Sequence, residues 1–385
     1  MIAYDTQALD ALDTLETANG WHRSEQLTGA QWQAVQEQNV PKFYTPNLFI
    51  RIGLAIFTLI LLISSIGLGW LVADTSSQEG TAILSFVFGL LTIAVLEKWA
   101  IKSARHFRSG VDDMMLYYGV GLMISSIWML LPYDTPPLAY AAVMLPFLVV
   151  GSIRYLDRLL TIGSFACTLA IIFLIVKDIP GLALYLLPLS GMAFGAAVYV
   201  FSQSGQRRED ARFWHGQLYV LEMLALMVFY ASGNYWVVQS AGVALFELDE
   251  MPVPYFFWTF TFLVPLVFIG MGLRKKDRIL LDIGLACVAA AIFSFRYYYS
   301  VLPLAWAGVL GGAFLFALSY FSTRYLGQHT GGSYTHEAEG DTTLLQEIEE
   351  QLIEQTIATQ NPPESRKPEG FGGGQFGGGG AGGDF

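Results

Sequence analysis

Charged residues and cysteines are both scarce in this chain of 385 residues. Only 14% of the residues are Asp, Glu, Lys or Arg, whereas soluble domains usually carry about 25%. Two cysteines exclude a disulfide framework and are too few for a cysteine-based zinc site. The formal net charge of −11 argues against nucleic acid as a partner, because such proteins present a basic surface to the phosphates. With 54% hydrophobic residues, the chain is neither an ordinary water-soluble enzyme nor a disordered polypeptide.

The common catalytic motifs are missing as well. The sequence contains no His-Glu-x-x-His, no phosphate-binding Gly-x-x-x-x-Gly-Lys-Ser/Thr and no Gly-x-Ser-x-Gly. None of the five histidines has a second ligand at helical spacing; they are His22, His106, His215, His329 and His336. We therefore expect no metal, no cofactor and no enzymatic activity.

What the chain does have is long apolar runs. A bilayer core of about 30 Å needs roughly 20 apolar residues in a helix. Measured in this way, residues 48–322 divide into ten candidate spans: 48–72, 81–97, 114–132, 138–153, 159–176, 182–201, 215–237, 254–273, 279–295 and 303–321. Because lipid offers the backbone no hydrogen-bond partners, each span should be helical. The sequence predicts an all-α polytopic membrane protein of about ten transmembrane helices.

Lysine and arginine predict the orientation. Cytoplasmic loops are enriched in these residues, and ten spans with both termini inside place all 21 of them in the cytoplasm except Lys177 and Arg296. The outer loops then carry mostly acidic residues, among them Asp74, Asp134 and Asp178. We expect both termini to be cytoplasmic.

A unit of four spans occurs twice, as 114–202 and 215–322. Arg154-Tyr-Leu-Asp157-Arg158 aligns with Arg274-Lys-Lys-Asp277-Arg278 at an offset of 120 residues. Nine residues after the second arginine of each motif comes a cysteine, and nine of the twenty aligned positions from each first arginine are identical. An even number of spans gives a parallel repeat. The alternative is chance similarity between two hydrophobic segments.

Small residues mark the last span of each unit. Gly191 and Gly195 in the first unit, and Gly308 and Gly312 in the second, have the small-xxx-small spacing that lets helix backbones approach closely. Cys167 and Cys287 lie within spans, where an unpaired cysteine behaves as a small hydrophobic residue.

Glu222 is the leading candidate for an intramembrane functional group. It lies about 12 Å along its helix from Trp214, at 1.5 Å per residue. An ionisable side chain at such depth is a functional candidate by default. Glu222 either binds a proton or a cation, or it is a buried carboxyl hydrogen-bonded to a polar group on a facing helix. Its counterpart in the first unit is Gly121.

Asp282 and Arg296 have simpler explanations. Asp282 follows Arg278 by four residues at the start of its span, so an i,i+4 pair and the helix dipole account for it. Arg296 precedes three tyrosines at an outer boundary, where it can snorkel into an aromatic belt or form part of an anion-attracting vestibule. Glu97 and Arg51 lie near span ends and are expected at the interface.

Polar segments flank the membrane domain. In residues 1–47, Asp5 is expected to cap a helix that stops at Asn19-Gly20, and Thr28-Gly-Ala-Gln31 fits a capping box for a second helix. This small module should pack on the membrane domain as a lid or serve as an adaptor for a partner. Residues 323–360 contain an acidic helix from Thr343 to about Ile357, and 361–385 form a Gly-rich tail expected to be disordered.

The negative charge belongs to these ends. Residues 1–47 carry −4 and residues 323–385 carry −7, whereas residues 48–322 are neutral. An anionic inner leaflet repels acidic segments, so if these ends bind anything, we expect a protein rather than the lipid surface.

Two features resemble known families. The module with Gly20-Trp21 and Thr28-Gly-Ala-Gln31, followed by spans with Arg-x-x-Asp-Arg loops, resembles bacterial multipass inner-membrane proteins of a domain-of-unknown-function family. That resemblance covers residues 15–322 and implies the bacterial inner membrane but no activity. The last fifteen residues resemble the Gly-rich tails of TPM-domain membrane proteins, and the TPM domain itself is absent.

Three functions are consistent with these features. The first is a non-enzymatic scaffold or accessory protein of an envelope assembly, acting through its cytoplasmic ends. The second is a proton-coupled secondary transporter of a small molecule that uses Glu222. The third, a membrane-embedded enzyme, has no motif in its favour.

Overall fold

The computed structural model describes residues 2–23, 26–39, 42–73, 77–247, 249 and 251–299, together with eight single positions between 309 and 324. The regular structure of these residues is helical, apart from one isolated bridge between Tyr44 and His106. The α-helices are α1 (Thr6–Arg23), α2 (Gly29–Gln38), α3 (Leu48–Val72), α4 (Gln78–Val95), α5 (Val111–Leu130), α6 (Pro137–Tyr155), α7 (Arg158–Val176), α8 (Ala183–Gln206), α9 (His215–Gly233), α10 (Tyr235–Phe246), α11 (Pro254–Lys275) and α12 (Arg278–Tyr298). A π-helical turn, η1 (Leu96–Ile101), extends α4, and a 3₁₀ helix, η2 (Glu209–Trp214), precedes α9.

The described helices confirm the fold class predicted from the sequence. Nine of them, all except α1, α2 and the short α10, are long and apolar enough to cross a membrane. They coincide with the first nine predicted spans, so the chain is an all-α polytopic membrane protein. The tenth predicted span, 303–321, lies mostly outside the described residues, and the acidic helix and the Gly-rich tail lie wholly outside them.

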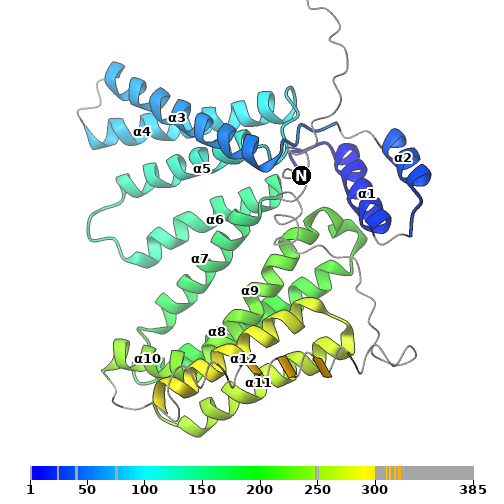
Figure 1. Cartoon of the computed structure of the whole chain (residues 1–385). Helices are drawn as coiled ribbons and strands as arrows, with labels where there is room; N and C mark the ends of the chain where they lie inside the picture. Colours follow the sequence, from blue (N-terminus) through cyan, green and yellow to red (C-terminus); the bar gives the residue numbers. More distant parts are fainter. Residues whose placement is uncertain are drawn as a thin grey trace, which may run out of the picture. The chain divides into compact units, whose positions relative to one another are not determined.

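Consecutive helices run back and forth and pack on their neighbours in sequence (Figure 1). Helix starts are fixed locally by caps: the side chains of Asn47, Ser77, Asp157 and Asp277 each accept a hydrogen bond from a backbone N–H of the first turn. The same applies to Thr28, where both hydrogen bonds of the predicted capping box are present.

Two predicted boundaries are wrong. Helix α1 continues past Gly20 to Arg23, because the Trp21 carbonyl accepts the N–H groups of Gln26 and Leu27 and the His22 ring stacks on Trp32 at 5.9 Å. These contacts with the following segment outweigh the local stop signal of Asn19-Gly20.

The predicted span 215–237 is interrupted. Helix α9 ends at Gly233, and Asn234 caps a separate helix, α10, which is only 12 residues long. The Asn234 side-chain oxygen accepts hydrogen bonds from the N–H groups of Trp236 and Val237 and from the hydroxyl of Ser294 in α12. An asparagine that satisfies the first turn of a new helix in this way ends the preceding one.

Glycines set the closest helix contacts. A Cβ atom placed on Gly195 would lie 2.7 Å from the carbonyl oxygen of Ala225 and 2.9 Å from the backbone nitrogen of Phe229, so only glycine lets α8 and α9 meet there. Gly191 likewise abuts Ser232. The small-residue prediction therefore holds for this pair. Gly308 and most of the segment around Gly312 lie outside the described residues, so the second pair stays a prediction.

The hairpins α6–α7 and α11–α12 share a local geometry. Each first helix ends at a residue in the left-handed conformation, Leu156 (φ 53°) or Lys276 (φ 57°). The aspartate that follows then caps the next helix through the N–H of a buried leucine. Cys167 and Cys287 are both buried within the second helix of their hairpin. The internal duplication itself stays a prediction.

The contact at Gly195 gives a direct test of this packing. We expect Gly195→Ala to lower the free energy of unfolding by about 1–3 kcal/mol, because the added methyl group would push α8 from the α9 backbone. The measurement is denaturant unfolding of the purified protein in detergent. Gly270→Ala in α11 is the control, since a Cβ atom there meets nothing within 4 Å. Equal stability of both variants would show that α8 and α9 do not approach as described.

Candidate functional site

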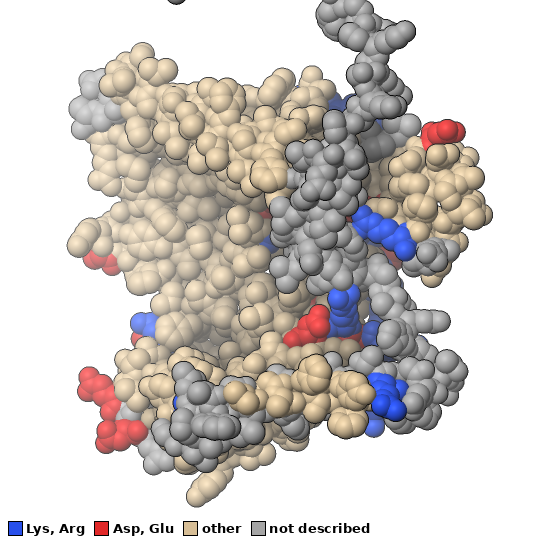
Figure 2. All heavy atoms as spheres, in the orientation of Figure 1, with Lys and Arg blue, Asp and Glu red and all other residues tan. Residues whose placement is uncertain are grey.

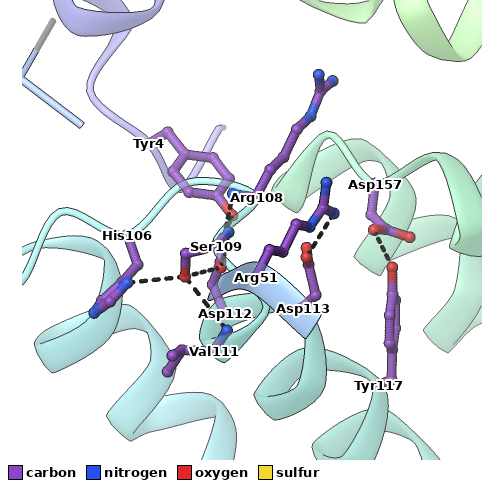
Figure 3. A network of polar contacts seen from close by, with 10 residues as sticks. All are labelled: Tyr4, Arg51, His106, Arg108, Ser109, Val111, Asp112, Asp113, Tyr117 and Asp157. Carbon is purple, nitrogen blue, oxygen red and sulfur yellow. Dashed lines mark hydrogen bonds and ion pairs between the residues drawn. The ribbon is translucent and has the colours of Figure 1, made fainter. Parts of the chain in front are cut away.

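A network of polar contacts surrounds Asp112, at the start of α5 (Figure 3). The Asp112 side chain is only 2% exposed. Its oxygens accept hydrogen bonds from the backbone N–H groups of Arg108 (2.8 Å) and Ser109 (2.9 Å), and from the Ser109 hydroxyl (2.8 Å). The fourth donor is the hydroxyl of Tyr4, 108 residues earlier, at 3.2 Å. This carboxylate therefore joins the N-terminal segment to the membrane domain.

Two further carboxylates lie beside it. Asp113 forms an ion pair with Arg51 of α3 at 2.7 Å. Asp157 accepts a hydrogen bond from the Tyr117 hydroxyl of α5 at 2.7 Å, while its other oxygen caps α7. Figure 3 shows both contacts next to Asp112. These contacts connect α3, α5 and the α6–α7 hairpin at one end of the helices.

A second ion pair continues the network. The Arg154 guanidinium of α6 donates to both Glu97 oxygens, at 2.7 Å and 2.9 Å, and the Tyr155 hydroxyl donates to Glu97 at 2.8 Å. Glu97 lies in the π-helical turn η1. The Arg154 carbonyl accepts the N–H of Ala3 at 2.9 Å, next to the Tyr4 contact. The first arginine of the repeated loop motif therefore helps to hold the N-terminal segment.

Apolar contacts reinforce the attachment. The Tyr4 ring packs edge-on against Phe43 and Phe107, with ring centroids 6.1 Å and 4.9 Å apart. Leu9 of α1 belongs to the same buried cluster, which also includes Leu96 and Leu116. The N-terminal module thus shares a hydrophobic core with α4–α7. It packs on the membrane domain, as expected from the sequence.

Exposed contacts complete the attachment. Asp10 of α1 pairs with Arg212 of η2 at 2.9 Å. The backbone of Tyr44 exchanges hydrogen bonds with the loop after η1, donating to Arg105 and accepting from Phe107. We call the end of the helices where these contacts lie the basic end; its loops are 102–110, 156–157, 207–214 and 276–277. Most Lys and Arg atoms visible in Figure 2 lie on the side of the molecule where α1 packs.

The network changes the titration of two side chains outside the membrane spans. Burial raises the pKa of the Tyr4 hydroxyl well above its usual value, and the negative charge of Asp112 adds to this effect. Burial lowers the pKa of the His106 imidazole, and the attraction of Asp112 opposes this effect. Tyr4 therefore stays protonated as a donor, and His106 resists protonation.

His106 and Ser109 form a pair that invites comparison with a catalytic serine. The His106 Nδ1 and Ser109 Oγ atoms lie 2.8 Å apart. The Ser109 hydroxyl, however, donates its hydrogen to Asp112, so His106 donates to Ser109 from Nδ1 and takes no proton from it. Ser109 is also fully buried. A nucleophile needs an adjacent base and access to a substrate. The two side chains instead form hydrogen bonds that hold the loop before α5 in place.

Glu222, the leading candidate from the sequence, is buried in α9 with 1% exposure. Its two oxygens accept hydrogen bonds from the side-chain amides of Gln203 (2.6 Å) and Gln206 (2.7 Å) in the last two turns of α8. Of the two interpretations, the arrangement matches a carboxyl bonded to polar groups on a facing helix. A transporter would require this side chain to face water.

The other predicted residues lie apart from the Asp112 network. Asp282 and Arg278 are 3.9 Å apart and both largely exposed, as their i,i+4 spacing predicts. Arg296 is half-buried and adjoins Tyr297 and Tyr298, whose rings pack on Trp236 and Trp258. In the repeated loop motif, Asp277 caps α12, Arg274 is exposed at the end of α11, and Arg158 begins α7 with its guanidinium against Gly216.

Sequence reasoning missed Asp112, Asp113 and the pairing of Glu97 with Arg154. Two adjacent aspartates at the start of a span are one available signal, and neither of them caps α5, whose N-cap is Gly110. Their partners lie from 57 to 108 residues away in the chain, so spacing alone could not identify them. No group of three or more possible metal ligands occurs within the described residues.

Asp112→Asn tests the attachment of the N-terminal segment. An asparagine NH₂ group would face donors rather than acceptors, so we expect the segment to open more easily by about 1–3 kcal/mol. Hydrogen exchange of residues 2–23 measures this opening. Asp282→Asn, an exposed aspartate in the same protein, is the control. Unchanged exchange in Asp112→Asn would contradict the role assigned to this carboxylate.

The lowered pKa of His106 predicts a pH dependence of the same attachment. The folded protein binds a proton at His106 less readily than the unfolded chain does, whose imidazole has a pKa of 6.5. The resulting stability is present above pH 6.5 and is lost as the pH falls below it. We expect hydrogen exchange in residues 101–110, corrected for its intrinsic pH dependence, to accelerate on acidification. His106→Gln should remove that acceleration, and its persistence in this variant would assign the effect to another group.

Comparison of the chain with protein-family models, with curated proteins and with solved structures finds no match.

Proposed function

We propose that this protein is a non-enzymatic scaffold or accessory protein of the bacterial cytoplasmic membrane, acting through its two cytoplasmic ends. The observation that carries the proposal is the attachment of the N-terminal module. Tyr4, Ala3 and Asp10 are bonded to α5, α6 and η2 respectively, so the module has a fixed place on the membrane domain.

One helix of the module, α2, is largely exposed on the surface of the protein. Helix α2 has no buried residue, although its Trp32 and Val35 are half-buried. Its exposed side chains are mostly amides and one carboxylate, including Gln33, Gln36 and Glu37. A fixed polar helix of this kind is suited to recognition by another protein, because little conformational entropy remains to be lost on binding.

The proposed location follows from charge. Lys and Arg residues concentrate in the loops of the basic end and are rare at the opposite helix ends. The positive-inside tendency supports a cytoplasmic position for that end. The acidic segment 323–385 carries −7 and supplies a second polar end for a protein partner.

The alternative of a proton-coupled transporter loses its main support. Both oxygens of Glu222 already accept hydrogen bonds from glutamine amides in a packed contact. Uptake of a small-metabolite panel into proteoliposomes provides the check. The scaffold proposal expects no proton-driven uptake, and uptake that Glu222→Gln abolishes would establish the transporter instead.

Photo-crosslinking tests the scaffold proposal directly. A photoreactive residue at Gln33 or Glu37 should yield discrete protein–protein adducts in the native membrane. The same residue at Leu266, a 63% exposed apolar position of α11, should yield adducts with lipid alone. Deletion of residues 341–385 should also change the set of co-purifying proteins. If α2 gives no protein adduct and the deletion leaves that set unchanged, the proposal is wrong.

A further inference from the structure

A small basic pocket lies where the N-terminal segment meets the loop after η1. It has a volume of about 170 Å³. Its apolar lining residues are Ala3, Ala8, Phe43 and Ile101. Its charged lining residues, which we call the rim, are Lys42, Lys102, Arg105 and Asp5. The rim thus combines three cations with one carboxylate and has a net charge of +2.

Backbone contacts fix the three segments that line the pocket. Tyr44 pairs with the loop that bears Arg105 and thereby places Lys42 opposite it. The backbone of Arg105 adopts a left-handed conformation (φ 55°), which is uncommon for a residue other than glycine. The hydrogen bond from the Tyr44 N–H to the Arg105 carbonyl holds it there. The N-terminal segment is held by Asp112 and the Arg154 carbonyl. The rim is therefore preorganised before any ligand arrives.

The cations of the rim have little internal compensation. Within the part of the chain that the structure describes, none of Lys42, Lys102 and Arg105 forms an ion pair within 4.0 Å. Asp5 uses one oxygen to accept the N–H of Gln7 in the first turn of α1. Elsewhere at the basic end, Arg51, Arg154 and Arg212 each have a carboxylate partner. Lys102 is attracted electrostatically to Glu97, but none of the three cations forms an ion pair among the described residues, which favours an external anion.

The pocket adjoins the end of a membrane span, where lipid headgroups are expected. The span Gln78–Ile101 contains 24 residues, about 36 Å of helix, against a hydrocarbon core of about 30 Å. Lys102 directly follows its last residue. Trp99, one turn earlier, is 51% exposed and marks the level at which tryptophans line membrane interfaces. A headgroup phosphate and a phosphate dissolved in the adjacent water can both reach this position.

We propose that the pocket formed by Lys42, Lys102 and Arg105 binds a phosphate group. Arginine and lysine are the side chains that bind phosphate oxygens through charge-assisted hydrogen bonds. Two segments distant in sequence, Lys42 and the loop 102–105, supply the ligands, so a bound phosphate also strengthens the contact between the N-terminal module and the membrane domain. The phosphate belongs to an anionic phospholipid or to a phosphorylated solute, and the experiment below distinguishes the two.

The test uses the full-length protein in detergent. Native mass spectrometry measures binding of phosphatidylglycerol, with phosphatidylcholine for comparison, and calorimetry measures binding of inorganic phosphate. We expect Lys42→Gln/Lys102→Gln to weaken binding by about ten-fold, the combined effect of two surface charges. Lys42→Arg/Lys102→Arg should retain binding. The matched control is Arg274→Gln/Lys275→Gln, which removes the same charge from exposed positions at the end of α11.

Each outcome is decisive. A loss confined to phosphatidylglycerol identifies a lipid headgroup, and a loss confined to inorganic phosphate identifies a solute. The proposal is overturned if neither probe depends on Lys42 and Lys102, or if the Arg274/Lys275 control loses as much affinity as the pocket variant. It is also overturned if the charge-conserving arginine variant fails to bind although it melts at the wild-type temperature.

Discussion

A carboxylate taken out of water must be given hydrogen-bond donors, because an unpaired buried charge costs several kcal/mol. At Asp112 the donors come from two places: the loop just before α5 and the hydroxyl of Tyr4. The four donors together leave the carboxylate oxygens well satisfied. The N-terminal segment is consequently part of the membrane domain's own polar interior, and removing it would leave this charge with fewer partners.

Other features of the basic end depend on the same contact. The Ala3–Arg154 hydrogen bond extends the attachment to α6, and the Arg154–Glu97 ion pair extends it to η1. Tyr4 packs on Phe43 and Phe107, which places Lys42 beside Lys102 and Arg105. An acidic N-terminal module thus contributes one lysine to a basic pocket. Net charge predicts repulsion between such a segment and an anionic leaflet, whereas the three cations of this pocket would attract an anion.

The sequence predicted what depends on neighbouring residues and missed what depends on distant ones. Nine spans and the capping box at Thr28 follow from local patterns of hydrophobicity and hydrogen bonding. Asn234 caps α10 locally and is also bonded to Ser294, 60 residues away, and Asp112 depends on Tyr4, 108 residues away. Glu222 attracted attention as an isolated charge, yet the sequence could not show that Gln203 and Gln206 face it.

Tyr4 and Asp112 act as one unit that holds the N-terminal module on the membrane domain. A double-mutant cycle of Tyr4→Phe and Asp112→Asn, read out as the opening free energy of α1 by hydrogen exchange, measures their coupling. We expect a coupling energy of about 1 kcal/mol or more, with the double variant little worse than Asp112→Asn alone. Additive effects, with no coupling between the two substitutions, would contradict it.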